Sequence, residues 1–202
     1  MSAAEEVASA PAASSPAPAP AAASPASAPV PPQAAQQYAN ALALFRAGNT
    51  TDAELEFKQL NASYPEFSGP AVNLGLLYMQ ASRLPEAEAA FKDATVRNPA
   101  SATAGNELGI VERRMGKFSE AEAAYQRTLA AQPDYAPAVL NLGVLYDLYL
   151  AEPQKALEQF ERYLQLVGDN KQVSGWVVEL RKRVGAAGVP ARPVPAATKE
   201  SS

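Results

Sequence analysis

Residues 68–101 read SGPAVNLGLLYMQASRLPEAEAAFKDATVRNPAS, and this stretch decides the fold. Its residue types return at intervals of 34 residues on both sides. The repeated positions are Leu74, Leu108 and Leu142, each followed by glycine; Ala53, Ala87 and Ala121; Phe57, Phe91 and Tyr125; and Pro65, Pro99 and Pro133. Four residue classes that keep one period indicate an internal repeat, in which each unit is one supersecondary element stacked on its neighbours.

Each repeated position has a physical reason if the unit is a pair of antiparallel helices. The glycine after leucine and the small alanine let two helices approach closely, and the aromatic rings fill the space between them. Proline cannot continue a helix, so Pro65, Pro99 and Pro133 are expected to end the second helix of each pair. Three dipeptides predict the turn inside a pair: Gly48-Asn49, Ser82-Arg83 and Gly116-Lys117.

This pattern resembles the tetratricopeptide repeat (TPR) family, whose signature is Leu-Gly, an aromatic residue three positions later, alanine, a second aromatic residue, alanine and a closing proline. Residues 68–101 match it best, and the resemblance covers residues 34–170. It implies an all-α, right-handed superhelical solenoid of four helix pairs. We expect repeats at 34–67, 68–101, 102–135 and 136–170. A capping helix is expected over 171–184, where apolar residues recur at helical spacing.

Three repeats depart from the pattern. The first has Asn40-Ala41 in place of Leu-Gly, as is common in a terminal repeat. The third has Glu112 where the second has Tyr78, and we expect this carboxylate to reach solvent or to pair with Arg113 or Arg114. The fourth carries one extra residue, which should lengthen its first helix or bulge its turn.

The two ends of the chain differ in composition from the repeats. Residues 1–33 contain eight of the 18 prolines among many alanines and serines. Such a segment cannot bury enough apolar surface to offset the entropy of ordering. We therefore expect residues 1–33 to be a disordered Ala/Pro/Ser-rich tether, residues 34–184 to be the TPR domain, and residues 185–202 to be a disordered tail.

The composition excludes several kinds of chemistry. The 202 residues include no cysteine and no histidine, which removes disulfides, Cys/His metal sites and the commonest catalytic bases and nucleophiles. The net charge of −4 does not suit broad nucleic-acid binding. No segment approaches 18 apolar residues, and no phosphate-binding or dinucleotide-binding motif is complete. We expect no enzyme activity, no cofactor, no metal site and no nucleic-acid partner.

The resemblance also implies a binding surface, because the first helices of successive TPR repeats line a concave groove. The residues at the family's groove-facing positions are Tyr38, Leu42, Phe45, Val72, Asn73, Leu76, Met79, Asn106, Glu107, Ile110, Arg113, Leu140, Asn141, Val144 and Asp147. Nine are apolar or aromatic, so we predict an apolar trough for a helix or an extended peptide. Asn73, Asn106 and Asn141 either bridge a peptide backbone or serve the structure. Arg113 could hold a carboxylate, and Asp147 a basic side chain.

These features predict a scaffold or adaptor that binds a peptide or helix of a partner protein. The alanine-rich composition, the absence of cysteine and the long tether resemble bacterial envelope-associated TPR lipoproteins. That resemblance implies a periplasmic protein in a cell-envelope complex that is tethered to a membrane by an N-terminal lipid. We expect the cysteine that carries this lipid to have been removed from the given sequence together with the export signal. Residues 1–30 themselves lack the basic start and the apolar core of a signal peptide. A cytosolic assembly or co-chaperone module and a self-assembling scaffold are the alternatives.

Overall fold

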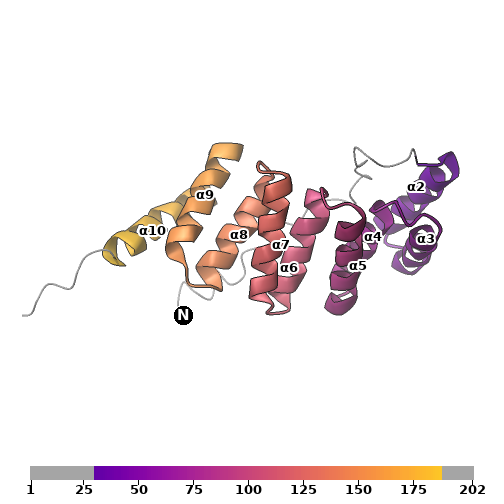
Figure 1. Cartoon of the computed structure of the whole chain (residues 1–202), viewed down its shortest axis with the longest axis horizontal. Helices are drawn as coiled ribbons and strands as arrows, with labels where there is room; N and C mark the ends of the chain where they lie inside the picture. The colour runs from indigo at the N-terminus through magenta and orange to yellow at the C-terminus, as the bar shows by residue number, and fades with distance from the viewer. Residues whose placement is uncertain (1–29, 188–202) are drawn as a thin grey trace, which may run out of the picture.

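The helices follow one another in chain order along a single axis in the computed structural model, which describes residues 30–187 (Figure 1). Within these residues there are nine helices and no strand. They are α2 (Pro32–Arg46), α3 (Thr50–Ser63), α4 (Gly69–Gln80), α5 (Leu84–Arg97), α6 (Ala102–Arg114), α7 (Phe118–Ala131), α8 (Ala136–Leu148), α9 (Pro153–Val167) and α10 (Lys171–Ala187). The expected all-α solenoid is confirmed. The proposed tether up to residue 29 and the tail from residue 188 lie outside the described residues.

Consecutive helices pack as pairs, with α2, α4, α6 and α8 as first helices and α3, α5, α7 and α9 as second helices. The glycines of the Leu-Gly dipeptides permit the close contact within a pair. An ideal Cβ on Gly75 would lie 2.5 Å from the ring of Phe91, and one on Gly109 would lie 2.5 Å from the ring of Tyr125. Because these separations are shorter than real Cβ contacts, only glycine fits at either position.

The turns inside the pairs use the left-handed backbone region. Gly48 and Gly116 have φ of 81° and 76°, and Ser82 takes the same role in the second repeat with φ of 58°. In the fourth repeat Ala151 has φ of 53°. Helix α8 has 13 residues, as α6 has, so the extra residue of this repeat lengthens the turn and not the first helix.

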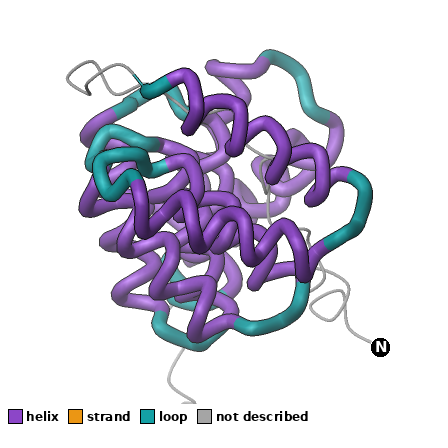
Figure 2. The backbone as a smooth tube through the Cα atoms, turned by 90° about the vertical axis from the view of Figure 1, so that its right-hand side faces the viewer, coloured by secondary structure: helices purple, strands orange, loops and turns teal. Residues whose placement is uncertain are grey.

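The first helices lie on the inner side of the stack. Helix α4 contacts α6 and α6 contacts α8, whereas no two of the second helices described here pack together as closely. A stack whose first helices are closer together than its second helices curves toward the first helices. The side formed by α2, α4, α6 and α8 is therefore the concave one. The loops lie at the ends of the helices (Figure 2).

The apolar interior divides into two clusters of buried side chains. The first cluster takes its residues from Ala34 to Ala124, and the second from Ile110 to Leu180. The two meet in α6 and α7. Helix α10 closes the second cluster, with the Trp176 ring 5.2 Å from that of Phe160. This helix ends at Ala187, three residues beyond the expected end of the cap. Among residues 30–187, no helix is both long enough and apolar enough to cross a membrane.

A tyrosine and a glutamate join neighbouring repeats at two of the interfaces. Tyr78 Oη donates to Glu54 Oε1 at 3.1 Å, and Tyr146 Oη donates to Glu122 Oε1 at 2.8 Å. Glu54, Glu88 and Glu122 follow the period of 34 residues. Glu88 therefore faces the third repeat at the point where that repeat lacks its tyrosine.

Glu112 occupies this point, and the expectation for its surroundings was wrong. The side chain is 2 % exposed, and the nearest cation is Lys92 on α5, with Nζ 3.8 Å from Oε1. Neither Arg113 nor Arg114 pairs with it, and Oε2 has no hydrogen-bond partner among residues 30–187. Because burial disfavours the charged form, the pKa of Glu112 is raised above its ordinary value.

Candidate functional site

The fifteen predicted groove residues lie on the four first helices and divide into two sets by exposure. Ten are buried: Tyr38, Phe45, Val72, Asn73, Asn106, Glu107, Ile110, Arg113, Asn141 and Val144. Five are partly exposed: Leu42, Leu76, Met79, Leu140 and Asp147. The first set builds the wall of the concave side, and the second set is what a ligand could touch directly.

The partly exposed apolar residues form a row along the concave side. Leu42 and Leu76 pack against the first core cluster and Leu140 against the second, while Met79 contacts both. The row takes its residues from α2, α4 and α8 and is interrupted at α6, whose predicted groove residues are all buried. Ile110, in contrast, is fully buried within the second cluster and belongs to the core. We name Leu42, Leu76, Met79 and Leu140 the apolar row.

The three asparagines lie at the bottom of the concave side and link first helices to one another. Asn73 Nδ2 donates to Tyr38 Oη at 2.6 Å and to Gly69 O at 3.0 Å, which connects α4 to α2. Asn141 Nδ2 donates to Asn106 Oδ1 at 3.0 Å, which connects α8 to α6. Each amide thus has a structural bond, and Asn73 Oδ1 has no hydrogen-bond partner among residues 30–187. A contact of these amides with a peptide backbone stays a prediction.

The two charged residues singled out in the third and fourth repeats differ in their partners. Asp147 Oδ1 accepts a hydrogen bond from Arg183 Nη1 of the capping helix at 2.6 Å. Its carboxylate is therefore engaged within the chain. Two basic residues near the end of α10 thus bond back to the stack, Arg183 to Asp147 of α8 and Arg181 to Glu161 of α9.

Arg113 is the only buried basic residue in the described part of the chain, with 7 % of its surface exposed. Its Nη1 donates to Tyr149 Oη at 3.4 Å, and its guanidinium lies 5.5 Å from the centre of the Tyr149 ring. Nε has no partner, and no carboxylate of residues 30–187 forms an ion pair with this side chain. A buried guanidinium is costly unless an anion or several acceptors compensate for its lost hydration.

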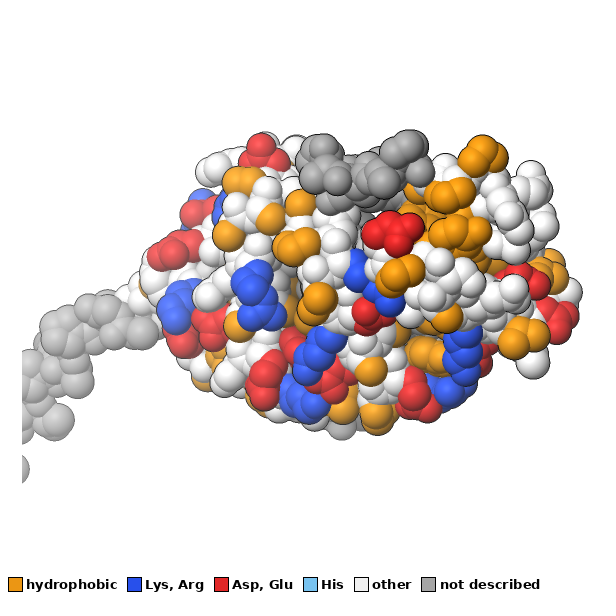
Figure 3. All heavy atoms as spheres, turned by 45° about the vertical axis from the view of Figure 1, so that its right-hand side comes forward, with side chains coloured by type: hydrophobic (Ala, Val, Ile, Leu, Met, Phe, Trp, Pro, Cys, Tyr) orange, Lys and Arg blue, Asp and Glu red, His pale blue; other side chains and the backbone are white. Residues whose placement is uncertain are grey.

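The outer surface shows no broad field of one sign on the face drawn in Figure 3, where Lys and Arg side chains alternate with Asp and Glu side chains. Several of these charges form ion pairs between or within helices, among them Arg83 with Glu54 and Arg97 with Asp93. Within residues 30–187, acidic side chains nowhere gather in a group that could hold a metal ion.

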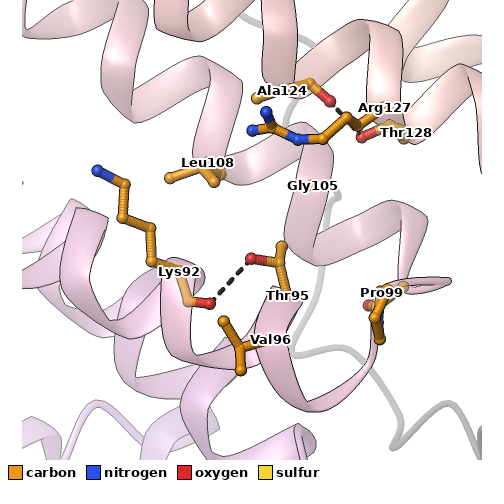
Figure 4. Close-up of a pocket in the computed structure, with 10 residues that line it drawn as sticks. Lys92, Thr95, Val96, Pro99, Gly105, Leu108, Ala124, Arg127 and Thr128 are labelled. Atoms are coloured by element: carbon orange, nitrogen blue, oxygen red, sulfur yellow. Dashed lines mark hydrogen bonds between the residues drawn. The ribbon is translucent and has the colours of Figure 1, made fainter.

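A pocket of about 340 Å³ opens between the second and third repeats, away from the apolar row. Its lining comes from α5, α6 and α7 and includes Leu108, Lys92 and Arg127 (Figure 4). Sequence reasoning did not identify this pocket. Because the lining belongs mainly to second helices and to the packed side of α6, the pocket lies toward the convex side.

Comparing neighbouring interfaces explains why the pocket exists. Between the first and second repeats, Asn61 Nδ2 donates to Asp93 Oδ2 at 3.1 Å, and Arg97 Nε donates to Asp93 Oδ1 at 2.8 Å. One period later the corresponding residues are Thr95, Arg127 and Ala131, which cannot form this network. Thr95 Oγ1 instead donates to Lys92 O within its own helix. The sequence therefore does contain a signal for this pocket, because the residues that bridge one interface are replaced one period later by residues that cannot.

Comparisons with known proteins agree with this architecture. A family model described as Tetratricopeptide repeat matches residues 38–102 and 106–171, which is well over half of the chain. A search of the curated proteins found no match.

Solved structures with the same fold have low sequence identity to this chain. A crystal structure of MamA is 23 % identical, covers 72 % of this chain and 84 % of its own, and has a TM-score of 0.66. PilF of Pseudomonas aeruginosa is 18 % identical over 76 % of this chain and 69 % of its own, also with a TM-score of 0.66. The first TPR domain of Spaghetti (RPAP3), solved with an HSP90 peptide, is 18 % identical over 58 % of this chain and 93 % of its own, with a TM-score of 0.55. At these identities the likeness shows the fold alone, and together with the family match it establishes that the chain belongs to the tetratricopeptide repeat family.

Proposed function

We propose that this protein is a non-catalytic adaptor that binds an extended segment of a partner protein on its concave side. The observation that carries the proposal is the apolar row, which places Leu42, Leu76, Met79 and Leu140 partly exposed on first helices of three repeats. Partly exposed apolar side chains on three first helices offer shallow contacts for side chains of a peptide. The buried asparagines beneath the row hold the first helices in register, so the surface is formed before a ligand arrives.

A known complex of the same fold supports an extended ligand. TPR domains are typically protein-interaction scaffolds, and the Spaghetti (RPAP3) domain is solved in complex with the HSP90 peptide SRMEEVD.

A selection from a displayed peptide library tests the proposal. Peptides enriched on the wild-type protein would be measured for binding to the Leu76→Glu and Leu140→Glu variants. We expect each substitution to weaken binding at least tenfold, because it places an unpaired charge in an apolar contact. Both side chains are already partly exposed, so the helical far-ultraviolet spectrum should not change. Ile110 is unsuitable for this purpose because its side chain is fully buried.

The matched controls are Leu55→Glu and Val96→Glu, which alter apolar residues on second helices. Leu55 is 66 % exposed and Val96 is 79 % exposed, so a charge should be tolerated at either position. Binding should survive both control substitutions. Peptides that lose affinity for the controls but keep it for the Leu76 and Leu140 variants would move the binding site to the convex side and contradict the proposal.

We further propose that the adaptor works in a bacterial cell-envelope complex on the periplasmic side, tethered to a membrane by an N-terminal lipid. This proposal rests on the resemblance to envelope-associated TPR lipoproteins and on the Ala/Pro/Ser-rich residues 1–33. Expression from the natural gene, followed by cell fractionation and labelling with a fatty acid, tests it. We expect the protein to carry the fatty-acid label and to be found in the membrane fraction, on the periplasmic side. Unlabelled protein confined to the cytosol would favour a cytosolic assembly or co-chaperone module.

A further inference from the structure

We propose that the pocket between the second and third repeats binds a small organic acid, with its apolar body inside the pocket and its carboxylate at Arg127. This site is separate from the concave side, so the proposal goes beyond the proposed function and does not depend on it. The pocket has a volume of about 340 Å³ and lies between α5, α6 and α7. Figure 4 shows its side chains around an open space, with Thr95 and Val96 of α5 opposite Leu108 of α6 and Arg127 of α7.

The next interface along the stack shows which groups are missing from this one. Three lining residues are smaller than the residues one period later, and those later residues all pack in or against the second core cluster. The pairs are Thr95 and Leu129, Gly105 and Val139, and Ser101 and Tyr135. Leu129 is 9 % exposed and Val139 is fully buried, so apolar side chains fill the later interface. The pocket lacks this apolar volume, and an apolar group from outside the chain can take its place.

The polar groups of the lining leave one strong donor for an outside ligand. Thr95 Oγ1 and Thr128 Oγ1 each donate to a backbone carbonyl of their own helix. Ser101 Oγ caps α6, and Lys92 Nζ pairs with a glutamate of its own helix at 2.6 Å. Arg127, in contrast, forms no hydrogen bond and no ion pair within residues 30–187. Its guanidinium is therefore available at the edge of the pocket.

The charges at the pocket favour an anion. Among the described residues that line it, Lys92 and Arg127 are basic and none is acidic. Glu112 lies one turn beyond Leu108 on α6 and interacts electrostatically with both cations. Burial raises the pKa of Glu112, which disfavours the charge that would repel an anionic ligand. Because a guanidinium can hold a carboxylate through two parallel hydrogen bonds, a carboxylate suits Arg127.

The volume and the lining set the kind of molecule that carries this carboxylate. An apolar cavity of about 150 Å³ can hold benzene, so about 340 Å³ accepts a ring with a short chain. Sites for small molecules combine a mostly apolar lining with a few polar groups that fix the orientation of the ligand. An extended peptide would need several donors and acceptors for its backbone, whereas the lining offers mainly Arg127. A compact apolar body with one anionic group is the class that fits.

A titration of the full-length, ¹⁵N-enriched protein with 3-phenylpropionate tests the proposal. This acid joins one aromatic ring to a carboxylate through two carbons, and 3-phenylpropanamide is the matched ligand without the charge. We expect the acid to shift the amide signals of Thr95, Gly105 and Ala124, while those of Leu42 and Leu140 on the concave side stay unchanged. The neutral ligand should bind at least about fivefold more weakly. Shifts confined to the concave side, or no shift at all, would overturn the proposal.

Two variants separate the apolar part of the site from the anionic part. Thr95→Leu introduces the residue found one period later and should abolish the shifts while the helical far-ultraviolet spectrum is kept. Arg127→Gln removes an exposed guanidinium and should weaken binding of the acid about fivefold without changing that of the neutral ligand. Arg46→Gln, at an exposed position of α2, is the matched control and should bind the acid as the wild type does. Unchanged binding by Thr95→Leu, or an equal affinity of Arg127→Gln and wild type for the acid, would contradict the assignment.

Discussion

Replacing Glu112 with tyrosine should stabilise the protein by about 2.5 kcal/mol at neutral pH. The substitution removes a buried carboxylate whose Oε2 has no hydrogen-bond partner, a defect that costs about 1–3 kcal/mol. It also supplies the hydroxyl that Tyr78 and Tyr146 donate to Glu54 and Glu122. A hydrogen bond to a charged acceptor contributes about 1.5–3 kcal/mol.

The lower ends of both ranges are appropriate, because the acceptor Glu88 is already bonded to Lys92 at 2.6 Å and to Lys117 at 2.7 Å. Their sum gives the stated magnitude of about 2.5 kcal/mol. For a folded unit of this size, each kilocalorie raises the melting temperature by about 2–4 °C. We therefore expect an increase of about 5–10 °C, measured by circular dichroism and checked by urea unfolding.

The pH dependence identifies the cause of the gain. Burial raises the pKa of Glu112, so the folded state binds more protons than the unfolded state, whose carboxyl titrates near 4.3. Stability of the wild type should then fall as pH rises from about 4.3 through the higher pKa of the folded state. Glu88, Glu120, Lys92 and Arg127, which also act on this carboxyl, are present in both proteins. The advantage of Glu112→Tyr should consequently shrink when unfolding is measured at pH 4.

The reciprocal substitution provides the control. Tyr78→Glu places a carboxylate opposite Glu54 in the second repeat and should destabilise the protein by a similar amount. Glu112→Gln removes the charge without adding the tyrosine hydroxyl and should give only part of the gain. If Glu112→Tyr lowers the melting temperature, or if its effect is the same at pH 4 and pH 7, the account of this interface is refuted.

Three other substitutions test the packing and the turns. Gly109→Ala should destabilise the protein by about 1–3 kcal/mol in urea unfolding, because the added Cβ would meet the Tyr125 ring; a neutral effect would contradict the close-contact role. Gly175→Ala, on a helix position with nothing within 4 Å, should instead stabilise by up to about 1 kcal/mol, and a loss would show a hidden contact. Ala151→Gly should stabilise by about 0.5–1 kcal/mol because it relieves a left-handed backbone; unchanged thermal unfolding would argue against strain at this turn.

The periodic residues of the sequence predicted the helix pairs because the contacts that these residues make are local or lie within one repeat. Gly75 and Phe91 are in the same pair, so their contact follows from the repeat itself. The turn dipeptides likewise act within a few residues. The fate of the extra residue in the fourth repeat was left open, because no residue near Leu148 marks the end of the first helix; in the structure α8 ends there and the turn takes the extra residue.

The candidate site was harder to predict because exposure depends on neighbouring repeats. The family register says which way a first helix faces, but it does not say that Asn106 and Ile110 are completely buried in the stack. The partner of Asp147 comes from the capping helix, 36 positions later, and the cation nearest Glu112 comes from the preceding repeat. Such contacts are set by the stacking of repeats and not by spacing within one of them.

The division of the interior into two clusters has a consequence for synthesis of the chain. The first cluster contains no residue beyond Ala124, so all of its parts exist before α8, α9 and α10 have been made. The leading half can therefore collapse on its own core while the trailing half is still inside the ribosome or a translocation channel. The trailing half then adds to a surface that is already ordered, and the capping helix, made last of all, closes it.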